Sequence, residues 1–313
     1  MRIAIIGAGM AGLSCGTRLA ESGHEVTVFD KGRGPGGRMA TRRVEHEGET
    51  FRFDHGAQYF TAREMAFQTQ VRAWEADGIV ARWPDAKEDA WVGTPGMNAP
   101  IRAMAEALDV RFGTRIDRLQ RTRGGWFLEA EGETSDVYQA VIVAVPAEQA
   151  APLFNSHVPD FAADARDVTS EPCWTAMAAL ESRVDAPDFL QDEGAIAWAA
   201  RNSSKPGRAT EDDRDQECWV IQASPRWSRA QLEREVENVR EELLAHFARA
   251  VGDLPPVRFS TAHRWRYAMC EKNDRQALWD ADERIGACGD WLSGPRVENA
   301  FLSGIALAQR IDA

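Results

Sequence analysis

The chain has 313 residues, of which 44% are hydrophobic, so it can bury a large core, and its length favours two domains over one. The formal net charge of -12 argues against non-specific binding to nucleic acid or to an anionic membrane surface. Local arginines can still serve a pocket for an anionic small molecule. The apolar start is interrupted by glycines, and no apolar stretch approaches the length of a membrane span, so neither a signal peptide nor a spanning helix is expected.

The cysteines are scattered, odd in number and without a CxxC pair: Cys15, Cys173, Cys218, Cys270 and Cys288. This pattern predicts reduced, mostly buried thiols in a cytoplasmic protein rather than disulfides. The six histidines are equally scattered, so we expect no metal site.

In chain order, residues 2–29 predict a βαβ unit. An apolar strand covers 2–6, a helix runs to about Ser22, and a second strand covers 25–29. The glycine- and arginine-rich segment 32–43 predicts no regular element. Strands are expected over 126–131 and 137–145, and the polar segment 201–217 is expected to be an exposed loop.

The clearest helix is predicted over 228–251, with Ser228 and Gln231 as a capping box and Trp227 and Leu232 as a hydrophobic staple. A strand over 285–288 and a helix over 297–311 close the chain. Because nucleotide-binding signals stand at both ends, one nucleotide domain is expected to be built from both ends, with a second domain between them.

The strongest motif is the GxGxxG sequence over 7–12, which lies between the first strand and the first helix. Gly7 permits the tight turn, Gly9 lets the backbone approach a pyrophosphate, and Gly12 allows close packing of helix on strand. Asp30 ends the second strand 18 residues after Gly12, where a carboxylate can accept hydrogen bonds from ribose hydroxyls. The motif predicts a dinucleotide site but cannot separate FAD from NAD.

Two later segments favour FAD. Residues 32–39 resemble the GGR segment of amine-oxidase-like flavoproteins, in which Arg38 can supply charge to the pyrophosphate. Residues 289–291, followed by 296–304, resemble the C-terminal GD motif of the same superfamily. There the aspartate bonds the ribityl chain or phosphate, and a helix N-terminus faces the flavin. Alone, the first segment reads as a basic loop and the second as an ordinary strand and helix.

Further blocks resemble the renalases, above all their bacterial form: residues 29–34, 36–39, 54–61, 91–98, 200–208, 262–268, 288–291 and 296–304. The middle blocks matter most, because the superfamily at large does not share them. The loop over 292–295 departs from the expected spacing, which leaves open the backbone amide that faces the flavin.

The resemblance implies an α/β fold with a Rossmann-like FAD-binding domain and a second, mixed α+β substrate domain of the p-hydroxybenzoate-hydroxylase type. We expect residues 1–60, 99–150 and 283–313 in the first domain, and 61–98 and 151–282 in the second. It also implies an oxidase that returns 1,2- and 1,6-dihydro isomers of NAD(P)H to NAD(P)+, with molecular oxygen reduced to hydrogen peroxide. Hydride transfer needs no obligatory acid, base or nucleophile from the protein, so no catalytic residue is assigned.

The expected non-covalent FAD site consists of Gly7, Gly9, Ala11, Gly12, Asp30, Lys31, Gly37, Arg38, Met39, Gly56, Ala57, Gln58, Ile116, Asp290, Val297, Glu298, Asn299 and Ala300. The expected substrate contacts are Gln58, Thr61, Gly96, Met97, Asn98, Arg201, Asn202 and His263. Each of the substrate contacts also has a structural reading, as a core residue or a surface charge. Cations expected near an anionic dinucleotide are Arg201, Lys205, Arg208, Arg264 and Arg266.

Two alternatives remain open. The first is an amine oxidase of the same fold, which typically frames its flavin with two aromatic rings; the chain has only three tyrosines, but its 11 tryptophans could substitute. The second is a binding module that has lost its flavin, against which the intact glycines and aspartates of the motifs argue.

Overall fold

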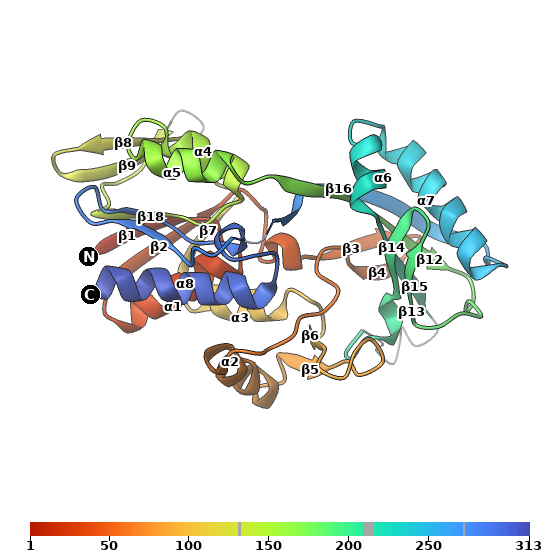
Figure 1. Cartoon of the computed structure of the whole chain (residues 1–313). Coiled ribbons are helices and arrows are strands. Elements are labelled where there is room, and N and C mark those ends of the chain that lie inside the picture. The colour runs from red at the N-terminus through yellow and green to blue at the C-terminus, as the bar shows by residue number, and fades with distance from the viewer. Residues whose placement is uncertain (131–132, 209–215, 272) are drawn as a thin grey trace.

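The computed structural model describes residues 1–130, 133–208, 216–271 and 273–313, and Figure 1 shows two parts joined by extended strands. The first part holds a six-stranded sheet in the order β17-β18-β11-β1-β2-β7, in which all neighbours are parallel except β17 and β18. Its strands are β1 Arg2–Ile6, β2 Glu25–Asp30, β7 Asp109–Phe112, β11 Ala140–Val143, β17 Leu278–Asp280 and β18 Ile285–Ala287.

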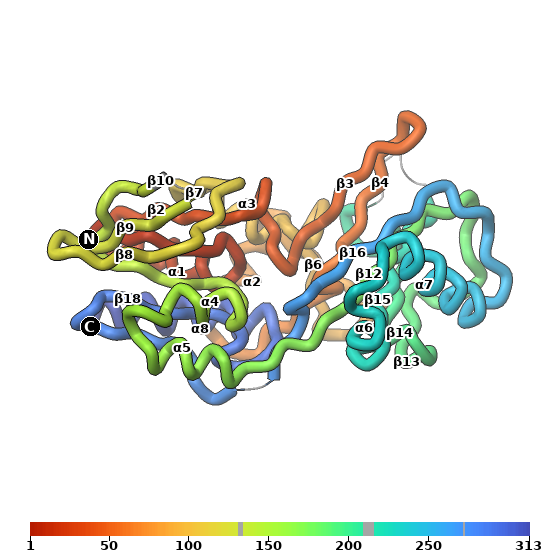
Figure 2. Tube along the Cα trace, turned by 90° about the horizontal axis from the view of Figure 1, so that it is seen from above, coloured from red at the N-terminus to blue at the C-terminus, as the bar shows by residue number. Residues whose placement is uncertain are grey.

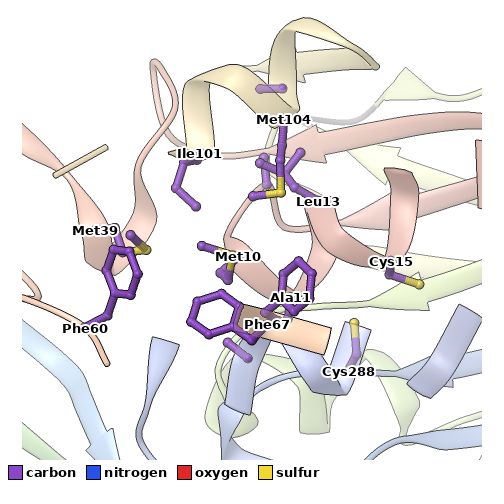
Figure 3. Packing of buried hydrophobic residues seen from close by; sticks show 14 of the residues in the cluster. Met10, Ala11, Leu13, Cys15, Met39, Phe60, Phe67, Ile101, Met104 and Cys288 are labelled. Atoms are coloured by element: carbon purple, nitrogen blue, oxygen red, sulfur yellow. The ribbon is translucent and has the colours of Figure 1, made fainter. Parts of the chain in front are cut away.

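Alternate side chains of the buried strands point to opposite faces of this sheet, and other elements cover each face. Ile3 and Ile5 pack in one hydrophobic cluster with helices α1 Met10–Glu21, α2 Met65–Ala76, α3 Ala99–Glu106 and α8 Val297–Asp312. Figure 3 shows the side chains of α1, α2 and α3 meeting in this cluster. Ala4 and Ile6 pack on the other side, with α4 Ala147–Phe154, α5 Pro159–Arg166 and the small sheet of β8 Arg118–Thr122, β9 Gly125–Ala130 and β10 Glu133–Thr134.

The second part is a five-stranded antiparallel sheet in the order β13-β14-β15-β12-β16. Its strands are β12 Ser170–Leu180, β13 Phe189–Glu193, β14 Ile196–Arg201, β15 Glu217–Ala223 and β16 Val257–Cys270. Helix α7 Val236–Val251 buries its apolar stripe on one face, and the hairpin of β3 Thr41–His46 and β4 Glu49–Asp54 packs on the other. Figure 2 shows this hairpin reaching from the first part towards the five-stranded sheet.

Several sequence predictions are confirmed. The opening βαβ unit, the C-terminal strand and helix, and the strand before residue 131 lie where the sequence placed them, with the buried strand over 137–145 shortened to β11. Residue 131 itself lies outside the described residues. The Rossmann-like α/β class is likewise borne out, with a second sheet built from the middle of the chain.

Two features are absent from the described residues: no helix has the length and apolar character that crossing a membrane requires, and no group of three or more His, Cys, Asp or Glu side chains could hold a metal ion.

The prediction of one helix over 228–251 is wrong. A short helix, α6 Pro225–Ala230, precedes α7, and Ser224 caps it by accepting a hydrogen bond from the Trp227 backbone N–H at 3.3 Å. Pro225 favours this start because proline suits the first helical position. Ser228 is not a cap: it is buried, and its hydroxyl accepts from the Trp174 backbone N–H at 3.0 Å.

The segment 32–43 also differs from the prediction. It contains the short 3-10 helix η1 Gly37–Met39 and the start of β3. The polar segment 201–217 is not an exposed loop where it is described: Arg201, Asn202, Lys205 and Arg208 are all buried. Residues 209–215 lie outside the described residues. Polar composition predicted exposure, but ion pairs and hydrogen bonds inside the protein permit burial.

The division into residues 1–60, 99–150 and 283–313 against 61–98 and 151–282 stays a prediction. Several elements nevertheless lie away from the part expected for them. Helices α2 and α5 pack on the six-stranded sheet. Strand β17 belongs to the six-stranded sheet, because it pairs with β18. The β3–β4 hairpin packs on the five-stranded sheet through Phe51 and Phe53.

Candidate active site

A cavity of about 560 Å³ lies between the two sheets. Its first wall comes from the start of α1, from η1 and from the segment that joins β18 to α8. Its second wall is the face of the five-stranded sheet opposite α7, where Cys173, Trp198, Gln222 and Trp265 line the space. The segment 56–61 runs between the two walls and lines the cavity throughout.

The glycine-rich turn at the start of α1 is built for close approach. Gly7 has a φ of +110°, which favours glycine, and its N–H donates to the Phe29 carbonyl at 2.7 Å. A Cβ on Gly12 would lie 2.0 Å from the Gly7 carbonyl oxygen, so helix and strand touch there. At Gly9 a Cβ would meet nothing within 4 Å, and the residue lines the cavity. The helix N-terminus therefore faces open space, as a pyrophosphate site requires.

Asp30 ties this turn to the next segment. Its carboxylate accepts hydrogen bonds from the backbone N–H groups of Ala8 at 2.7 Å and Gly32 at 2.6 Å. Each oxygen keeps a lone pair for a ribose hydroxyl. Of the other residues expected here, Lys31 donates to Gln149 at the surface, and Ile116 is buried in the core beneath α4.

Arg38 and Asp290, which were expected to contact the cofactor separately, bind each other. Two parallel hydrogen bonds of 2.8 and 2.5 Å join the guanidinium to the carboxylate, and both side chains line the cavity. This fork-to-fork geometry fixes both groups. Near them, a Cβ on Gly37 would lie 3.8 Å from the Gly9 Cα, so η1 sits against the glycine-rich turn.

The N-terminus of α8 borders the cavity through Val297, Glu298 and Ala300. Glu298 is 1% exposed, and its carboxylate accepts from the backbone N–H groups of Arg63 at 2.6 Å and Glu64 at 2.7 Å. Its second oxygen pairs with Arg296 at 2.7 Å. Glu298 therefore fastens the segment after residue 61 to the helix and balances the adjacent arginine.

Asn299 turns away from the cavity and orders the loop whose spacing departed from expectation. Its side-chain amide donates to the carbonyls of Ser293 and Gly294, each at 3.1 Å. Thr61 lies on the cavity wall, where its hydroxyl accepts from Arg296 at 2.8 Å.

Gln58 lines the cavity but is held from behind by a buried charge cluster, which consists of Asp54, Lys205 and Arg208. The Lys205 ammonium donates to the Gln58 side-chain oxygen at 3.1 Å and lies 3.3 Å from the Asp54 carboxylate, which Arg208 contacts at 2.6 Å. Burial raises the pKa of Asp54, but the charges of Arg208 and Lys205 outweigh it and hold that pKa well below its usual range. Burial lowers the pKa of Lys205 to about 8.

The other substrate contacts expected between 96 and 202 do not line the cavity. Arg201 is 1% exposed and bonds Glu217 at 2.9 Å, Asp188 and the Val184 carbonyl. Asn202 accepts from the Asp54 backbone N–H at 3.2 Å.

Residues 96–98, which were also expected to contact the substrate, form hydrogen bonds behind the cavity instead. The Met97 backbone N–H donates to the Asp54 carboxylate at 3.0 Å, and the Asn98 amide donates to the Pro35 carbonyl at 3.2 Å. A Cβ on Gly96 would lie 2.7 Å from the Thr41 hydroxyl oxygen. These residues brace the segments behind the cavity.

His263 lies in a ring cluster behind the wall residue Trp265. Its ring meets His55 edge to face with centroids 5.0 Å apart, and Trp265 at 4.4 Å. Burial lowers the pKa of His55 to about 4, so that ring is neutral at neutral pH. The Trp265 indole N–H donates to the His55 carbonyl at 2.8 Å, which fixes the wall.

The charged side chains of the cavity wall differ from those that the sequence suggested. Arg264 and Arg266 pair with Glu233 outside the cavity, and Arg201, Lys205 and Arg208 are engaged as described. Among the described residues, the wall carries two acids, Asp290 and Glu298, each paired with an arginine, and four cations, which we call the wall cations: Arg38, Arg63, Lys87 and Arg296. Lys87 pairs with Asp89, and Arg63 has no ion-pair partner among the described residues.

Sequence reasoning missed the wall residues Cys173, Trp198, Gln222, Arg63 and Lys87. Alternation along a strand separates two faces but does not say which face meets a second part of the chain. No local signal marks these positions.

Two protein-family models match successive parts of the chain. The model of an "NAD(P)-binding Rossmann-like domain" matches residues 5–73, and that of "Flavin containing amine oxidoreductase" matches residues 82–312. Among curated proteins, the 4,4'-diapophytoene desaturase of Staphylococcus aureus (strain Newman) is 49% identical over 51 residues. That match covers 16% of this chain and 10% of the desaturase, so the part of the chain that matches spans about a tenth of the length of such relatives.

Solved structures share the fold over the whole chain. A putative protoporphyrinogen oxidase from Exiguobacterium sp. 255-15 superposes with a TM-score of 0.77 at 11% identity, covering 100% of this chain and 98% of that one. Putrescine oxidase bound to putrescine gives 0.69 at 16% identity, with 100% and 99% covered. Cyclohexylamine oxidase from Brevibacterium oxydans IH-35A gives 0.69 at 11% identity, with the same coverage.

Proposed function

The chain belongs to the flavin containing amine oxidoreductase family, and from that premise we propose that it oxidises the 1,2- and 1,6-dihydro isomers of NAD(P)H to NAD(P)+. When bound, FAD supplies the hydride acceptor, and molecular oxygen with one proton from solvent takes up the two electrons as hydrogen peroxide. We further propose that FAD is held without a covalent bond. The open space at Gly9 and the cavity beside Arg38 and Asp290 fit the pyrophosphate and ribityl parts of such a cofactor.

The observation that carries the proposed substrate is the charge of the cavity wall. Two of the four wall cations, Arg38 and Arg296, pair with the two wall acids, and Lys87 pairs with Asp89, so Arg63 is the wall cation that has no ion-pair partner among the described residues. Such a wall attracts an anionic dinucleotide and repels a cationic amine. This local excess of positive charge contrasts with the net charge of -12 for the whole chain.

The protein's own contribution is orientation, because hydride transfer between two rings depends on their alignment. Trp198 and Trp265 give the cavity flat apolar walls, and the segment 56–61 is pinned by the buried charge cluster. Cys173 lines the cavity, but burial raises its pKa to about 11, so its thiol stays protonated and does not act as a base or nucleophile at neutral pH.

An amine oxidase is the second candidate, and the aromatic walls favour it. The rings of Tyr59 and Trp198 have centroids 5.7 Å apart, and both residues line the cavity. These two rings, which contact each other, offer an aromatic surface to an amine in its neutral form. The similar putrescine and cyclohexylamine oxidases show that the fold can serve amines.

Stopped-flow absorbance of the flavin without oxygen separates these functions. We expect rapid bleaching by 1,2- or 1,6-dihydro-NAD, slow bleaching by ordinary NADH and none by simple amines. Ordinary NADH carries its hydride on a different ring carbon, so it presents the wrong atom. Rapid reduction by a monoamine or polyamine, with the dihydro isomers inert, would overturn the proposal and establish the amine oxidase.

The charge argument has its own test. Arg63→Gln should raise the Kd of the dinucleotide about 2- to 5-fold, more at low salt, because the side chain is exposed and its interaction is screened. Arg266→Gln is the matched control, since Arg266 pairs with Glu233 outside the cavity. If both substitutions changed the Kd equally, the wall cations would have no specific role in substrate binding.

A further inference from the structure

Gln222, on β15, presents a hydrogen-bond acceptor of fixed orientation to the cavity. Its side-chain nitrogen donates to the Gly56 carbonyl at 2.7 Å, and the residue lines the cavity from the sheet side. The side-chain oxygen takes no part in this hydrogen bond, and no other hydrogen bond engages it among the described residues.

The Gly56 carbonyl does not permit the opposite orientation of this amide. A carbonyl oxygen can only accept, so a flipped Gln222 would set oxygen against oxygen. The same oxygen also accepts from the Gln58 side-chain nitrogen at 3.0 Å. Gly56 itself cannot move far, since a Cβ there would lie 2.0 Å from the Arg38 carbonyl oxygen. The neighbouring Ala57 N–H donates to that same oxygen at 2.8 Å.

Gln58 does not offer a comparable acceptor, although it lines the same cavity. Its nitrogen donates to the carbonyls of Asp54 at 2.6 Å and Gly56 at 3.0 Å, and its oxygen accepts from Lys205 at 3.1 Å. Gln222 therefore has the side-chain amide oxygen that remains available to a ligand.

A flat aromatic surface lies beside this acceptor. Trp198 on β14 is the direct cross-strand partner of Gln222, so both side chains stand on the same face of the sheet. The Trp198 ring is held by Phe189, with centroids 5.1 Å apart and planes inclined by 7°. A planar ring with an N–H donor on a short substituent matches this combination of surface and acceptor.

We infer that Gln222 is a specificity-determining residue that accepts a hydrogen bond from the carboxamide N–H of the substrate's pyridine ring, which lies along Trp198. This inference rests on the proposed function and names the part of the site that recognises the reacting ring. Under the proposed function the wall cations act on the phosphates of the same substrate, so the two groups of contacts serve different parts of the molecule.

The test pairs a substrate change with a protein change. Analogues in which a 3-acetyl group replaces the carboxamide keep the ring and the carbonyl but lack the N–H donor. The wild type should bind NAD+ about 2- to 10-fold more tightly than 3-acetylpyridine adenine dinucleotide, as one net hydrogen bond implies. Gln222→Met removes the acceptor at similar volume, so its preference should fall to about 1. Gln120→Met, at an exposed position on β8, should keep the wild-type ratio.

Binding is measured by calorimetry on the oxidised holoprotein, and stopped-flow reduction by the dihydro forms of both dinucleotides gives a second readout. A wild type that binds both dinucleotides equally overturns the inference without any variant, so a misfolded Gln222→Met would not leave it untested. An unchanged ratio in a folded Gln222→Met overturns it as well. If no dihydronicotinamide reduces the wild-type flavin, the proposed function itself has failed.

Discussion

Lys205→Met probes the buried charge cluster behind the cavity. In the native protein the Lys205 side chain is fully buried between Asp54 and Gln58, and burial lowers its pKa from 10.5 to about 8. Asp54 keeps Arg208 as an ion-pair partner after the substitution, at 2.6 Å. The variant therefore removes one buried charge without leaving a carboxylate unpaired.

The sign of the effect follows from proton binding. Between the native pKa of about 8 and the ordinary value of 10.5, the unfolded chain holds a proton on Lys205 that the native protein has released. Because the unfolded state binds more protons, the free energy of unfolding rises with pH across this window. At about 1.36 kcal/mol for each pKa unit, the rise is on the order of 3 kcal/mol. Lys205→Met lacks this contribution.

Urea unfolding of wild type and variant at pH values from about 7.5 to about 10 measures this contribution. Subtracting the two plots of unfolding free energy against pH cancels the other titrating groups. The control is Lys87→Met, because the Lys87 side chain is 46% exposed and water still solvates it. It should keep the wild-type slope. Parallel curves for wild type and Lys205→Met would refute the reasoning and mean that water or a rearrangement relieves the buried charge.

Three further predictions concern the flavin. Asp30→Ala should weaken FAD binding by about 1.5–3 kcal/mol in a titration of the apoprotein, because it removes charge-assisted hydrogen bonds to the ribose and frees the Ala8 and Gly32 amides. Ala300→Asp should lower the reduction potential measured by dye equilibration, since a carboxylate in the first turn of α8 opposes charge on the reduced flavin. Acid precipitation should release all yellow colour into the supernatant.

Each of these has a contradicting outcome. If Asp30→Ala bound FAD with unchanged affinity, Asp30 would make no contact with the cofactor and would only hold the end of β2 in place. A potential that rises or stays constant in Ala300→Asp would place the flavin ring away from α8. Colour that remains in the acid pellet would mean a covalent link; the sequence pointed to Cys288, but that residue is buried in the core, so the first candidate is the cavity residue Cys173.

The sequence by itself determined the features whose causes are local. The turn of Gly7 and Gly12 could be predicted because backbone conformation and close contact select glycine at fixed spacing, and β1, α1 and β2 follow from their apolar periodicity. The C-terminal strand, GD motif and helix were equally readable. Their order along the chain was enough to predict a flavoprotein of this α/β class.

The tertiary structure alone decided which charges face the cavity. Arg208 and Asp54 are 154 positions apart, and Arg38 and Asp290 are 252 apart, so no local pattern announces that these groups neutralise each other. A polar segment is exposed when its side chains hydrogen-bond to water. The buried side chains of residues 201–208 instead bond to carboxylates and amides inside the protein. The same holds for Gln222, because its role depends on which face of β15 meets the segment 56–61, and only the packing of the two parts settles that.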